Sequence, residues 1–216
     1  MISFQFMVLN SSTIRSMKKI GCGWQYTVYD IGSGRIRKIF NTETQAYLIF
    51  LRECFPYTTF PLWKFSSLRE GMKRKAEVSL AWIKNTSLGP ALFGNPKILN
   101  ETDYEQDLVI PLDRYLKDVT FDQGKKIVDE FVILSKFFIQ NEVIDKSFLI
   151  GKNYGINKDQ KIILTDIGEL FIGKEKVTTQ VRIRPWDHPY VTKTIPKELR
   201  KYFVEEMDKS LLEIVA

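Results

Sequence analysis

The sequence predicts an α+β protein of two lobes, with an antiparallel β-sheet in the N-terminal lobe and a shortened, mostly helical C-terminal lobe. Three observations lead to this prediction. Residues 20–29 have the pattern of a hairpin with a glycine-containing turn, and residues 36–39 follow as an apolar strand. Longer segments with helical periodicity come next, and a second hairpin pattern occupies residues 153–166.

The first hairpin has glycines at the two places where its turn can approach a ligand. Gly21 and Gly23 carry no Cβ, so the backbone at these positions can lie close to a phosphate group. The next strand contains Lys38 between apolar neighbours, and a lysine in such a position needs an anionic partner. The pattern therefore favours a nucleotide site in which the turn covers the phosphates and Lys38 binds them.

Two helices are expected after this hairpin. Residues 42–55 read as a helix with Thr42 as its N-cap and Pro56 as its end. A second helical stretch covers residues 66–85. The apolar run at residues 91–93 then follows a Gly-Pro pair, and we expect it to be a strand.

The middle of the chain marks the boundary between the lobes. The run 107–116 begins as a buried strand, and Pro111 stops its ladder because proline has no N–H to donate. Residues 121–140 form a long amphipathic helix. Its core-facing stripe consists of Ile127, Phe131, Leu134 and Phe138. We accordingly divide the chain into an N-lobe, residues 1–110, and a C-lobe, residues 111–216.

The second hairpin brings two oxygen-bearing side chains together. A strand, a polar turn and a second strand place Asn153 and Asp166 side by side at the two ends of residues 153–166, and Gly168 follows. An amide oxygen and a carboxylate are hard ligands suited to a Mg²⁺ ion that bridges phosphates. The sequence thus predicts a magnesium site at this hairpin.

With these motifs in order, the chain resembles the protein-kinase-like superfamily over roughly residues 18–170. In that superfamily the magnesium-binding asparagine of the catalytic loop precedes the aspartate of the DFG motif by about thirteen residues, which is the separation of Asn153 and Asp166. Ile167 replaces the phenylalanine, a change in packing rather than in metal ligation. The resemblance implies a minimal bilobal kinase-like fold with ATP and Mg²⁺ as cofactors.

The resemblance also implies roles for the residues of the glycine turn. The segment from Gly21 to Tyr26 would cover the phosphates, with Val28 in the apolar position of the family's motif and Lys38 on the α- and β-phosphates as a catalytic residue. Tyr26 stands where the family has its third glycine. Its side chain either caps the nucleotide or occludes the site, and the sequence does not choose between these roles.

Two further parts of an ATP site are implied by analogy alone. Free backbone groups near Ile110 and Leu112 would form the hinge that hydrogen-bonds the adenine edge. In kinases a helix glutamate pairs with the strand lysine, and Glu77 is our first choice for this role, with Glu53 and Glu70 as alternates. Glu77 as an ordinary exposed helical glutamate is an equal alternative.

The resemblance departs from the kinase pattern where the catalytic aspartate should be. Ser147 or Phe148 occupies that place, and neither is an acid. Asp145 nearby could act as an off-template base, or it could hydrogen-bond the loop backbone. A serine here, an Asp-x-Gly-Glu ending and the chain length also resemble the small bacterial kinase-like proteins of the PhoP regulatory network, the YrbL type.

This pattern is compatible with two classes of protein, an enzyme and a regulator. Phosphoryl transfer passes through a largely dissociative transition state, so metal and lysine can accelerate it without a strong base. The 48 residues that follow Gly168 lack an Ala-Pro-Glu motif. We therefore expect an atypical phosphotransferase acting on a small or non-protein acceptor, or alternatively an inactive pseudokinase that binds a nucleotide or a regulatory protein.

Composition adds a third alternative and several exclusions. The 216 residues are 44% hydrophobic, 27% charged and carry a net charge of +6, as expected of a moderately basic globular protein. Basic residues gather in two clusters: Arg69, Lys73, Arg74 and Lys75, and then Arg182, Arg184, Lys193, Lys197, Arg200 and Lys201. Such runs are usually solvated faces, although a basic scaffold for nucleic acid or a partner protein is the alternative. No nucleic-acid motif supports that third possibility.

The remaining signals concern the cell compartment. Cys22 and Cys54 are the two cysteines, and we expect both to be free thiols of a reducing compartment. The lone histidine, His188, lies near two prolines and is expected in a surface turn. No apolar run is long enough for a membrane helix, and residues 1–9 lack the basic start of a signal peptide. These features predict a cytoplasmic protein, which we expect to be monomeric.

Overall fold

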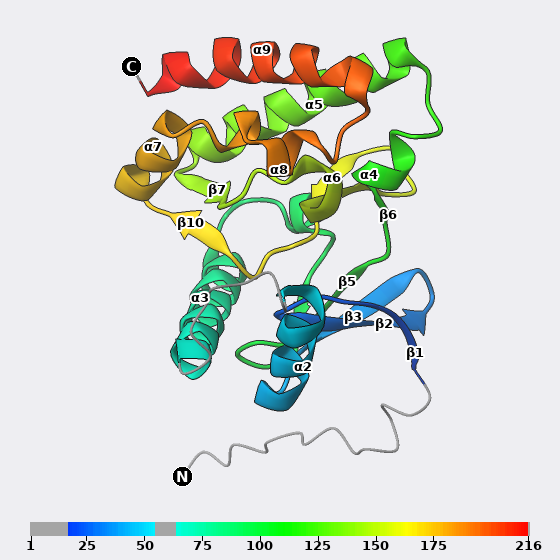
Figure 1. Cartoon of the computed structure of the whole chain (residues 1–216), viewed down its shortest axis with the longest axis vertical. Helices are drawn as coiled ribbons and strands as arrows, with labels where there is room; N and C mark the ends of the chain where they lie inside the picture. The colour runs from blue at the N-terminus through cyan, green and yellow to red at the C-terminus, as the bar shows by residue number, and fades with distance from the viewer. Residues whose placement is uncertain (1–16, 55–63, 216) are drawn as a thin grey trace.

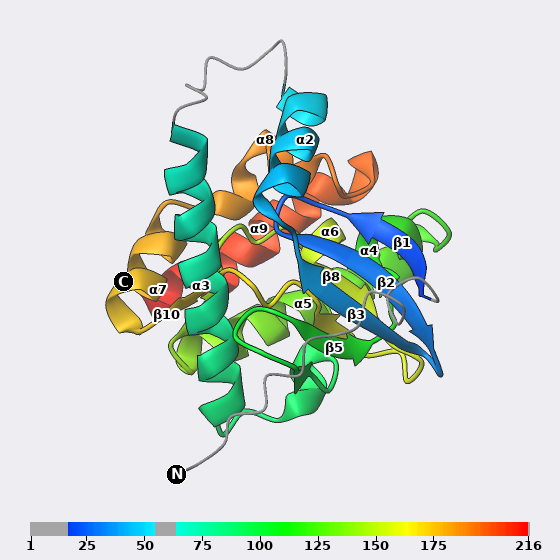
Figure 2. The same ribbon diagram turned by 90° about the horizontal axis from the view of Figure 1, so that it is seen from below.

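The computed structural model describes residues 17–54 and 64–215 as an α+β fold in two parts, which confirms the predicted class (Figure 1). A five-stranded antiparallel sheet with two helices forms the N-terminal part, and a mostly helical region with small strands forms the C-terminal part. Seen from below, β1, β2, β3 and β5 lie side by side, with helix α3 beside the sheet (Figure 2).

The N-terminal sheet has the strand order β1-β2-β3-β5-β4. Its strands are β1 (Lys18–Cys22), β2 (Tyr26–Gly32), β3 (Arg35–Phe40), β4 (Lys97–Ile98) and β5 (Tyr104–Asp107). The helices of this part are α2 (Glu43–Cys54) and α3 (Phe65–Asn85), with the 3₁₀ turn η2 (Pro90–Phe93) after them. The first hairpin is thus present where the sequence predicts it, with its turn at residues 23–25.

The C-terminal part is built around helix α5. Its helices are α4 (Leu112–Tyr115), α5 (Phe121–Gln140), α6 (Ile150–Asn153), α7 (Lys174–Arg182), α8 (Pro189–Thr192) and α9 (Arg200–Leu211). Its strands are β6 (Ile110–Pro111), β7 (Val143–Asp145), β8 (Tyr154–Ile156), β9 (Ile162–Leu164) and β10 (Leu170–Ile172), in the sheets β6-β8-β9 and β10-β7. Short 3₁₀ turns are η3 (Pro185–Asp187), η4 (Lys197–Leu199) and η5 (Leu212–Ile214).

The two faces of the N-terminal sheet differ in chemistry because side chains alternate along each strand. On one face Arg35 pairs with Asp107 at 2.8 Å, and Arg37 pairs with Glu105 at 2.5 Å. Lys38 lies on the opposite face, which is turned toward the protein interior. The two arginine–carboxylate pairs therefore lie on the outer face of the sheet. The candidate site lies on the inner face.

The two N-terminal helices confirm the sequence prediction. Thr42 Oγ1 accepts a hydrogen bond from the Gln45 backbone N–H at 3.3 Å, and Gln45 Oε1 accepts one from the Thr42 backbone N–H at 2.9 Å. This is a capping box, which fixes the start of α2. Pro56, the expected end of this helix, lies outside the described residues. Helix α3 matches the stretch expected at residues 66–85 to within one residue.

Two strand predictions are wrong. Residues 91–93 belong to the 3₁₀ turn η2, because Pro90 favours a helical start and Gly94 ends the turn with a left-handed φ of 67°. The strand expected to begin at residue 107 lies earlier, as β5. Its residues Tyr104–Asp107 are mostly polar, so their burial was not evident from an apolar pattern.

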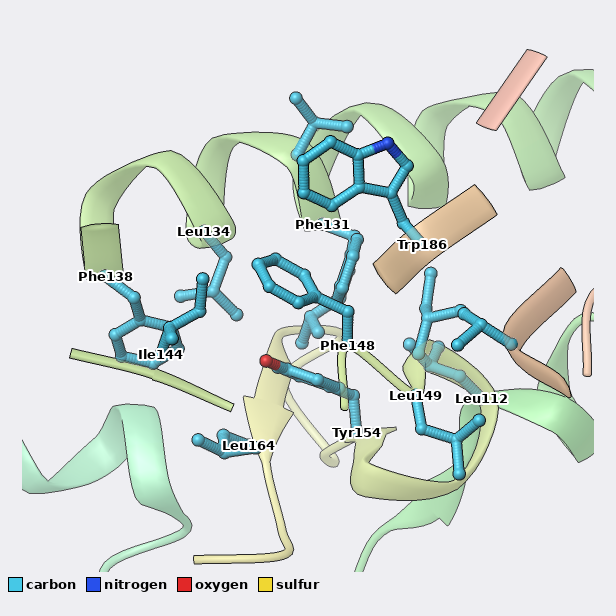
Figure 3. Close-up of a cluster of buried hydrophobic side chains, with 14 of the residues drawn as sticks. Leu112, Phe131, Leu134, Phe138, Ile144, Phe148, Leu149, Tyr154, Leu164 and Trp186 are labelled. Atoms are coloured by element: carbon cyan, nitrogen blue, oxygen red, sulfur yellow. The ribbon is translucent and has the colours of Figure 1, made fainter. Parts of the chain in front are cut away.

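The main core lies between α5 and the strands beneath it. Thr120 caps this helix in a capping box with Gln123, and the predicted stripe is buried along its length. Phe131 has no solvent exposure and packs edge-on against Tyr154 at 4.8 Å between ring centroids (Figure 3). The hairpin that carries the candidate site is therefore held by the core of the C-terminal part.

Three smaller expectations can be compared with the structure. Cys22 is a free thiol, whereas the side chain of Cys54 lies outside the described residues. His188 is exposed, and its Nδ1 accepts a hydrogen bond from the Tyr190 N–H at the start of α8. Within the described parts of the chain, every helix is too short or too polar to cross a membrane.

Candidate functional site

Lys38 lies on the inner face of the N-terminal sheet with 9% of its surface exposed. Its ammonium donates a 2.7 Å hydrogen bond to the carbonyl of Thr165 and lies 5.5 Å from the centre of the Tyr104 ring. Burial lowers the pKa of Lys38, and the nearby carboxylate of Asp166 opposes this by favouring the charged form. The structure thus brings Lys38 to the segment that contains Asp166.

The second hairpin places Asn153 and Asp166 together, as the sequence predicts. Strands β8 and β9 pair Tyr154 with Leu164, so the residues flanking them meet. The Asn153 carbonyl accepts hydrogen bonds from the backbone N–H of Thr165 at 2.7 Å and of Asp166 at 3.2 Å. These bonds fix the backbone of both candidate metal ligands.

One oxygen of the Asp166 carboxylate is available to bind a ligand. Its Oδ1 is buried without a hydrogen-bond partner among the described residues. Buried carboxylate oxygens are normally paired, and an orphan of this kind is a common feature of ligand sites. The described residues contain no group of three or more His, Cys, Asp or Glu side chains that could hold a metal. A metal here would take its other ligands from phosphates and water, which is the usual coordination of Mg²⁺.

Asp145 takes the second of its two expected roles, because it hydrogen-bonds the loop that follows it. It is 2% exposed and accepts hydrogen bonds from the backbone N–H of Leu149 and Ser147 at 3.2 and 3.3 Å. The Asn153 amide nitrogen also donates to both of its oxygens, at 3.0 and 3.1 Å, and to Ser147 Oγ at 2.9 Å. Asp145 therefore orients Asn153 through the nitrogen of its side-chain amide.

The charge of Asp145 is poorly tolerated in this position. Burial, together with the neighbouring Asp166 carboxylate, raises its pKa to about 7, although the hydrogen bonds from Ser147, Asn153 and Leu149 act in the opposite direction. The two carboxylates are thus electrostatically coupled although they perform different structural tasks.

The loop between Asp145 and Asn153 contains a strained residue. Phe148 has a φ of 50°, a conformation that is costly for a residue with a large side chain. Its ring has no solvent exposure and lies 5.3 Å from the ring of Trp186, edge to face (Figure 3). Burial of this ring offsets the backbone strain and fixes the loop that presents Asp145 and Ser147.

Asn41 is a site residue that the sequence reasoning missed. It is 1% exposed, and its side-chain nitrogen donates to the carbonyls of Gly23 at 2.7 Å and Trp24 at 3.1 Å. Its backbone N–H donates to the Gln25 carbonyl at 2.8 Å, and its side-chain oxygen accepts from the Thr27 hydroxyl at 2.6 Å. The glycine turn is therefore tied to the end of β3. The sequence signal that could have identified this residue is an asparagine directly before the Thr42 N-cap.

The residues predicted for the glycine turn occupy different environments. Gly23 is exposed at the tip of the turn, and Gly21 lies in β1 with Val28 opposite. Val28 is half-buried and pairs with Lys38 across β2 and β3. Tyr26 is 5% exposed and points to the inner face. The site therefore brings Val28, Lys38 and Tyr26 to one face of the sheet.

The structure does not bring Glu77 to Lys38. Glu77 forms an ion pair with Lys73, one turn earlier on α3, at 3.6 Å. It lines a groove of about 570 Å³ together with α3 residues and residues 98–101. Of the alternates, Glu70 is exposed, and the side chain of Glu53 lies outside the described residues. Glu77 does not reach Lys38 because of the rotation of α3 about its axis, which places Ala76 and Leu80 on the buried face of the helix.

Helix α3 instead contacts Glu169 and Leu170, which directly follow the Asp166–Gly168 segment, through other side chains. Ser79 Oγ accepts a 3.0 Å hydrogen bond from the Leu170 N–H. Lys75 lies 3.6 Å from a carboxylate oxygen of Glu169, whose other oxygen lies 3.7 Å from Lys146. A lysine and a serine thus link this helix to the site.

The expected hinge residues lie at the start of the C-terminal part. Ile110 is paired with Ile156 in the β6-β8 ladder, and Leu112 begins α4 with a fully buried side chain. A Cβ placed on Gly155 would lie 2.4 Å from Val109 Cγ2 and 2.8 Å from the Ile110 carbonyl oxygen. The chain between the two parts therefore lies directly on the second hairpin, with β6 at the edge of the β6-β8-β9 sheet.

Much of the basic charge noted in the sequence is engaged within the fold. Arg69 donates to the Asn41 carbonyl and lies 4.6 Å from the centre of the Phe40 ring. In the C-terminal cluster, Arg184 forms a bidentate pair with Asp208 at 2.8 and 2.5 Å. These contacts give both arginines a structural task within the fold, so neither needs an anionic ligand from outside the protein.

Comparison with known proteins adds little to this geometry. No family model matches the chain, and no curated protein matches it. Among solved structures, the chain is similar to Rv3197 of Mycobacterium tuberculosis, determined as a complex with erythromycin, at 12% sequence identity and a TM-score of 0.46. The match covers 82% of this chain and 52% of that one, so this chain spans about half of its length.

Proposed function

We propose that the protein is a kinase-like protein that binds ATP together with Mg²⁺. In this proposal Lys38 binds the α- and β-phosphates, and Asn153 and Asp166 hold the metal. The observation that carries it is the buried Oδ1 of Asp166, which lies near the Lys38 ammonium and has no hydrogen-bond partner among the described residues. The bound Mg²⁺ would supply charge neutralisation of the phosphates.

The first test is thermal unfolding with and without ATP and Mg²⁺. A ligand at ~100 times its dissociation constant adds roughly 2.7 kcal/mol of stability, which corresponds to a rise in Tm of about 5 to 10 °C for a chain of this size. We expect this rise in the wild type and its loss in Asp166→Ala and Lys38→Met. The methionine keeps much of the lysine side-chain volume, so that variant is expected to fold.

Two matched substitutions control for a general loss of charge. Lys126 and Asp118 are exposed, so Lys126→Ala and Asp118→Ala should keep the full response. A wild-type protein whose Tm does not respond to ATP and Mg²⁺ would contradict the proposed site. Steeply salt-dependent binding to nucleic acid in that protein would then favour the basic scaffold.

Two kinds of activity are compatible with such a site. As the first candidate, we propose an atypical phosphotransferase that acts on a small or non-protein acceptor. Metal and lysine carry most of the acceleration in a dissociative transition state, so a strong base is not required. The second candidate, a regulatory pseudokinase, is favoured by the burial of Asp145, which holds Asn153 and is shielded from solvent.

Product analysis separates these candidates. ADP formation that exceeds the Asp166→Ala background and depends on an added acceptor supports the transferase. Nucleotide binding without any ADP formation supports the pseudokinase.

A further inference from the structure

The side chain of Tyr26 fills the space where the glycine turn meets the Asp166–Gly168 segment. Strand β2 pairs Val28 with Lys38 and Tyr26 with Phe40. Directly paired residues of an antiparallel ladder point to the same face, so the Tyr26 ring and the Lys38 side chain share the inner face of the sheet.

The contacts of the ring show how closely this space is filled. The Tyr26 ring lies 5.4 Å from the rings of Phe40 and Tyr104, in edge-to-face arrangements. A Cβ placed on Gly168 would lie 2.8 Å from Tyr26 Cε2 and 3.0 Å from its hydroxyl. The ring therefore rests on the glycine of the Asp-x-Gly segment, which has no side chain that would keep it away.

Contacts on two sides hold the glycine turn against the Asp166–Gly168 segment. On one side, the side-chain nitrogen of Asn41, at the end of β3, donates hydrogen bonds to the carbonyls of Gly23 and Trp24. On the inner side, Gln25 Oε1 lies 3.1 Å from the Cβ position of Gly168. Gln25 and Tyr26 thus lie directly on the Asp166–Gly168 segment. A nucleotide whose phosphates bind at this segment would need the same space.

Polar groups at this contact are incompletely paired. Tyr26 Oη, Gln25 Nε2 and Asp166 Oδ1 are all buried without a hydrogen-bond partner among the described residues. Unpaired buried polar groups cost free energy, so the packing of the aromatic ring stabilises this arrangement while its polar groups oppose it.

We propose that Tyr26 is an autoinhibitory plug, whose ring shares the inner face of the sheet with Lys38 and must leave that face before a nucleotide binds. This inference rests on the proposed ATP site and adds its regulation. The apparent affinity of a ligand is reduced by the fraction of molecules in the binding-competent state. A variant without the plug should therefore bind ATP and Mg²⁺ more tightly than the wild type does.

The first readout needs no nucleotide. The full-length protein is treated with a small amine-reactive ester, and labelling of Lys38 is measured by mass spectrometry relative to the exposed Lys126. Tyr26→Val keeps a strand-forming residue but is too short to reach Gly168. If the open state is a minor one, populated to ~10% or less, labelling of Lys38 should rise at least about tenfold in this variant.

Two variants test whether the ring itself is responsible. Tyr26→Phe keeps the ring and should leave Lys38 as protected as in the wild type. Gly168→Ala keeps Tyr26 but should displace its ring and raise the labelling, which preserves the test if Tyr26→Val does not fold. Phe203→Ala removes a fully buried ring on α9 and controls for general loosening of the fold.

The second readout is the dissociation constant for ATP and Mg²⁺, measured by calorimetry. Tighter binding by Tyr26→Val, by about tenfold or more, supports the plug. Unchanged Lys38 labelling in both opening variants, or an equal rise in Phe203→Ala, would overturn it. If labelling rises while neither wild type nor Tyr26→Val binds nucleotide, the cover over Lys38 stands and the proposed ATP site fails.

Discussion

Raising the pH from about 4 to above 7 is expected to lower the stability of the protein through Asp145. Its pKa in the folded state is about 7, against an ordinary value of 3.8. The folded state keeps this proton over a range in which the unfolded chain has released it. The contribution is fully present below about pH 4 and is lost as the pH rises through 7, with a total of roughly 4 kcal/mol at about 1.36 kcal/mol per pH unit.

Urea unfolding at a series of pH values measures this effect. Because other groups titrate as well, the informative quantity is the difference in unfolding free energy between the wild type and Asp145→Asn. The neutral amide carries no such proton, so the variant should lack this decline. Asp118→Asn, at an exposed carboxylate, should keep the wild-type slope. Parallel pH profiles for the wild type and Asp145→Asn would contradict the assignment.

Replacement of Trp186 by alanine should cause the largest loss of stability among single substitutions around the site loop. The indole is fully buried, packs against Phe148, and donates a 3.0 Å hydrogen bond to Asp208. Deletion of a buried aromatic ring costs about 3–5 kcal/mol, against a total stability of roughly 5–15 kcal/mol for a domain. Without this partner the Phe148 ring also loses the packing that offsets its backbone strain.

Denaturant unfolding of Trp186→Ala provides the measurement. Trp82 is a suitable comparison because it is only partly buried, so Trp82→Ala should cost less. Trp186→Phe keeps a ring against Phe148 and should lie between the wild type and the alanine variant. A loss no larger for Trp186→Ala than for Trp82→Ala would show that the loop does not depend on this contact.

The sequence predicted best those elements whose signals are local. Helices α2, α3 and α5 were found close to their actual bounds because caps and 3.6-residue periodicity act within a few turns. The hairpin that joins Asn153 to Asp166 was found for the same reason, since strand, turn and strand are contiguous. The short apolar run 91–93 was misassigned because periodicity cannot separate a strand from a helical turn over three residues.

The partners of side chains were decided only in three dimensions. The sequence offered three glutamates for Lys38, but the rotation of α3 pairs Glu77 with Lys73 and turns Ser79 and Lys75 toward the site. The binding of Asn41 to the glycine turn likewise joins residues that are far apart in the chain. Such contacts depend on how elements pack, and a sequence pattern within one element carries no information about that packing.

Tyr26 illustrates the division between the two sources of information. The register of β2 and β3 places its side chain on the same face as Lys38, because successive side chains point to opposite faces of a sheet. Whether it caps or fills the space depended on what lies opposite, and the fold places Gly168 there. The sequence by itself determined the two-part α+β fold and the pairing of Asn153 with Asp166. The tertiary structure alone decided the surroundings of Lys38 and Tyr26, because the groups that they contact, Thr165 and Gly168, come from elements distant in the chain.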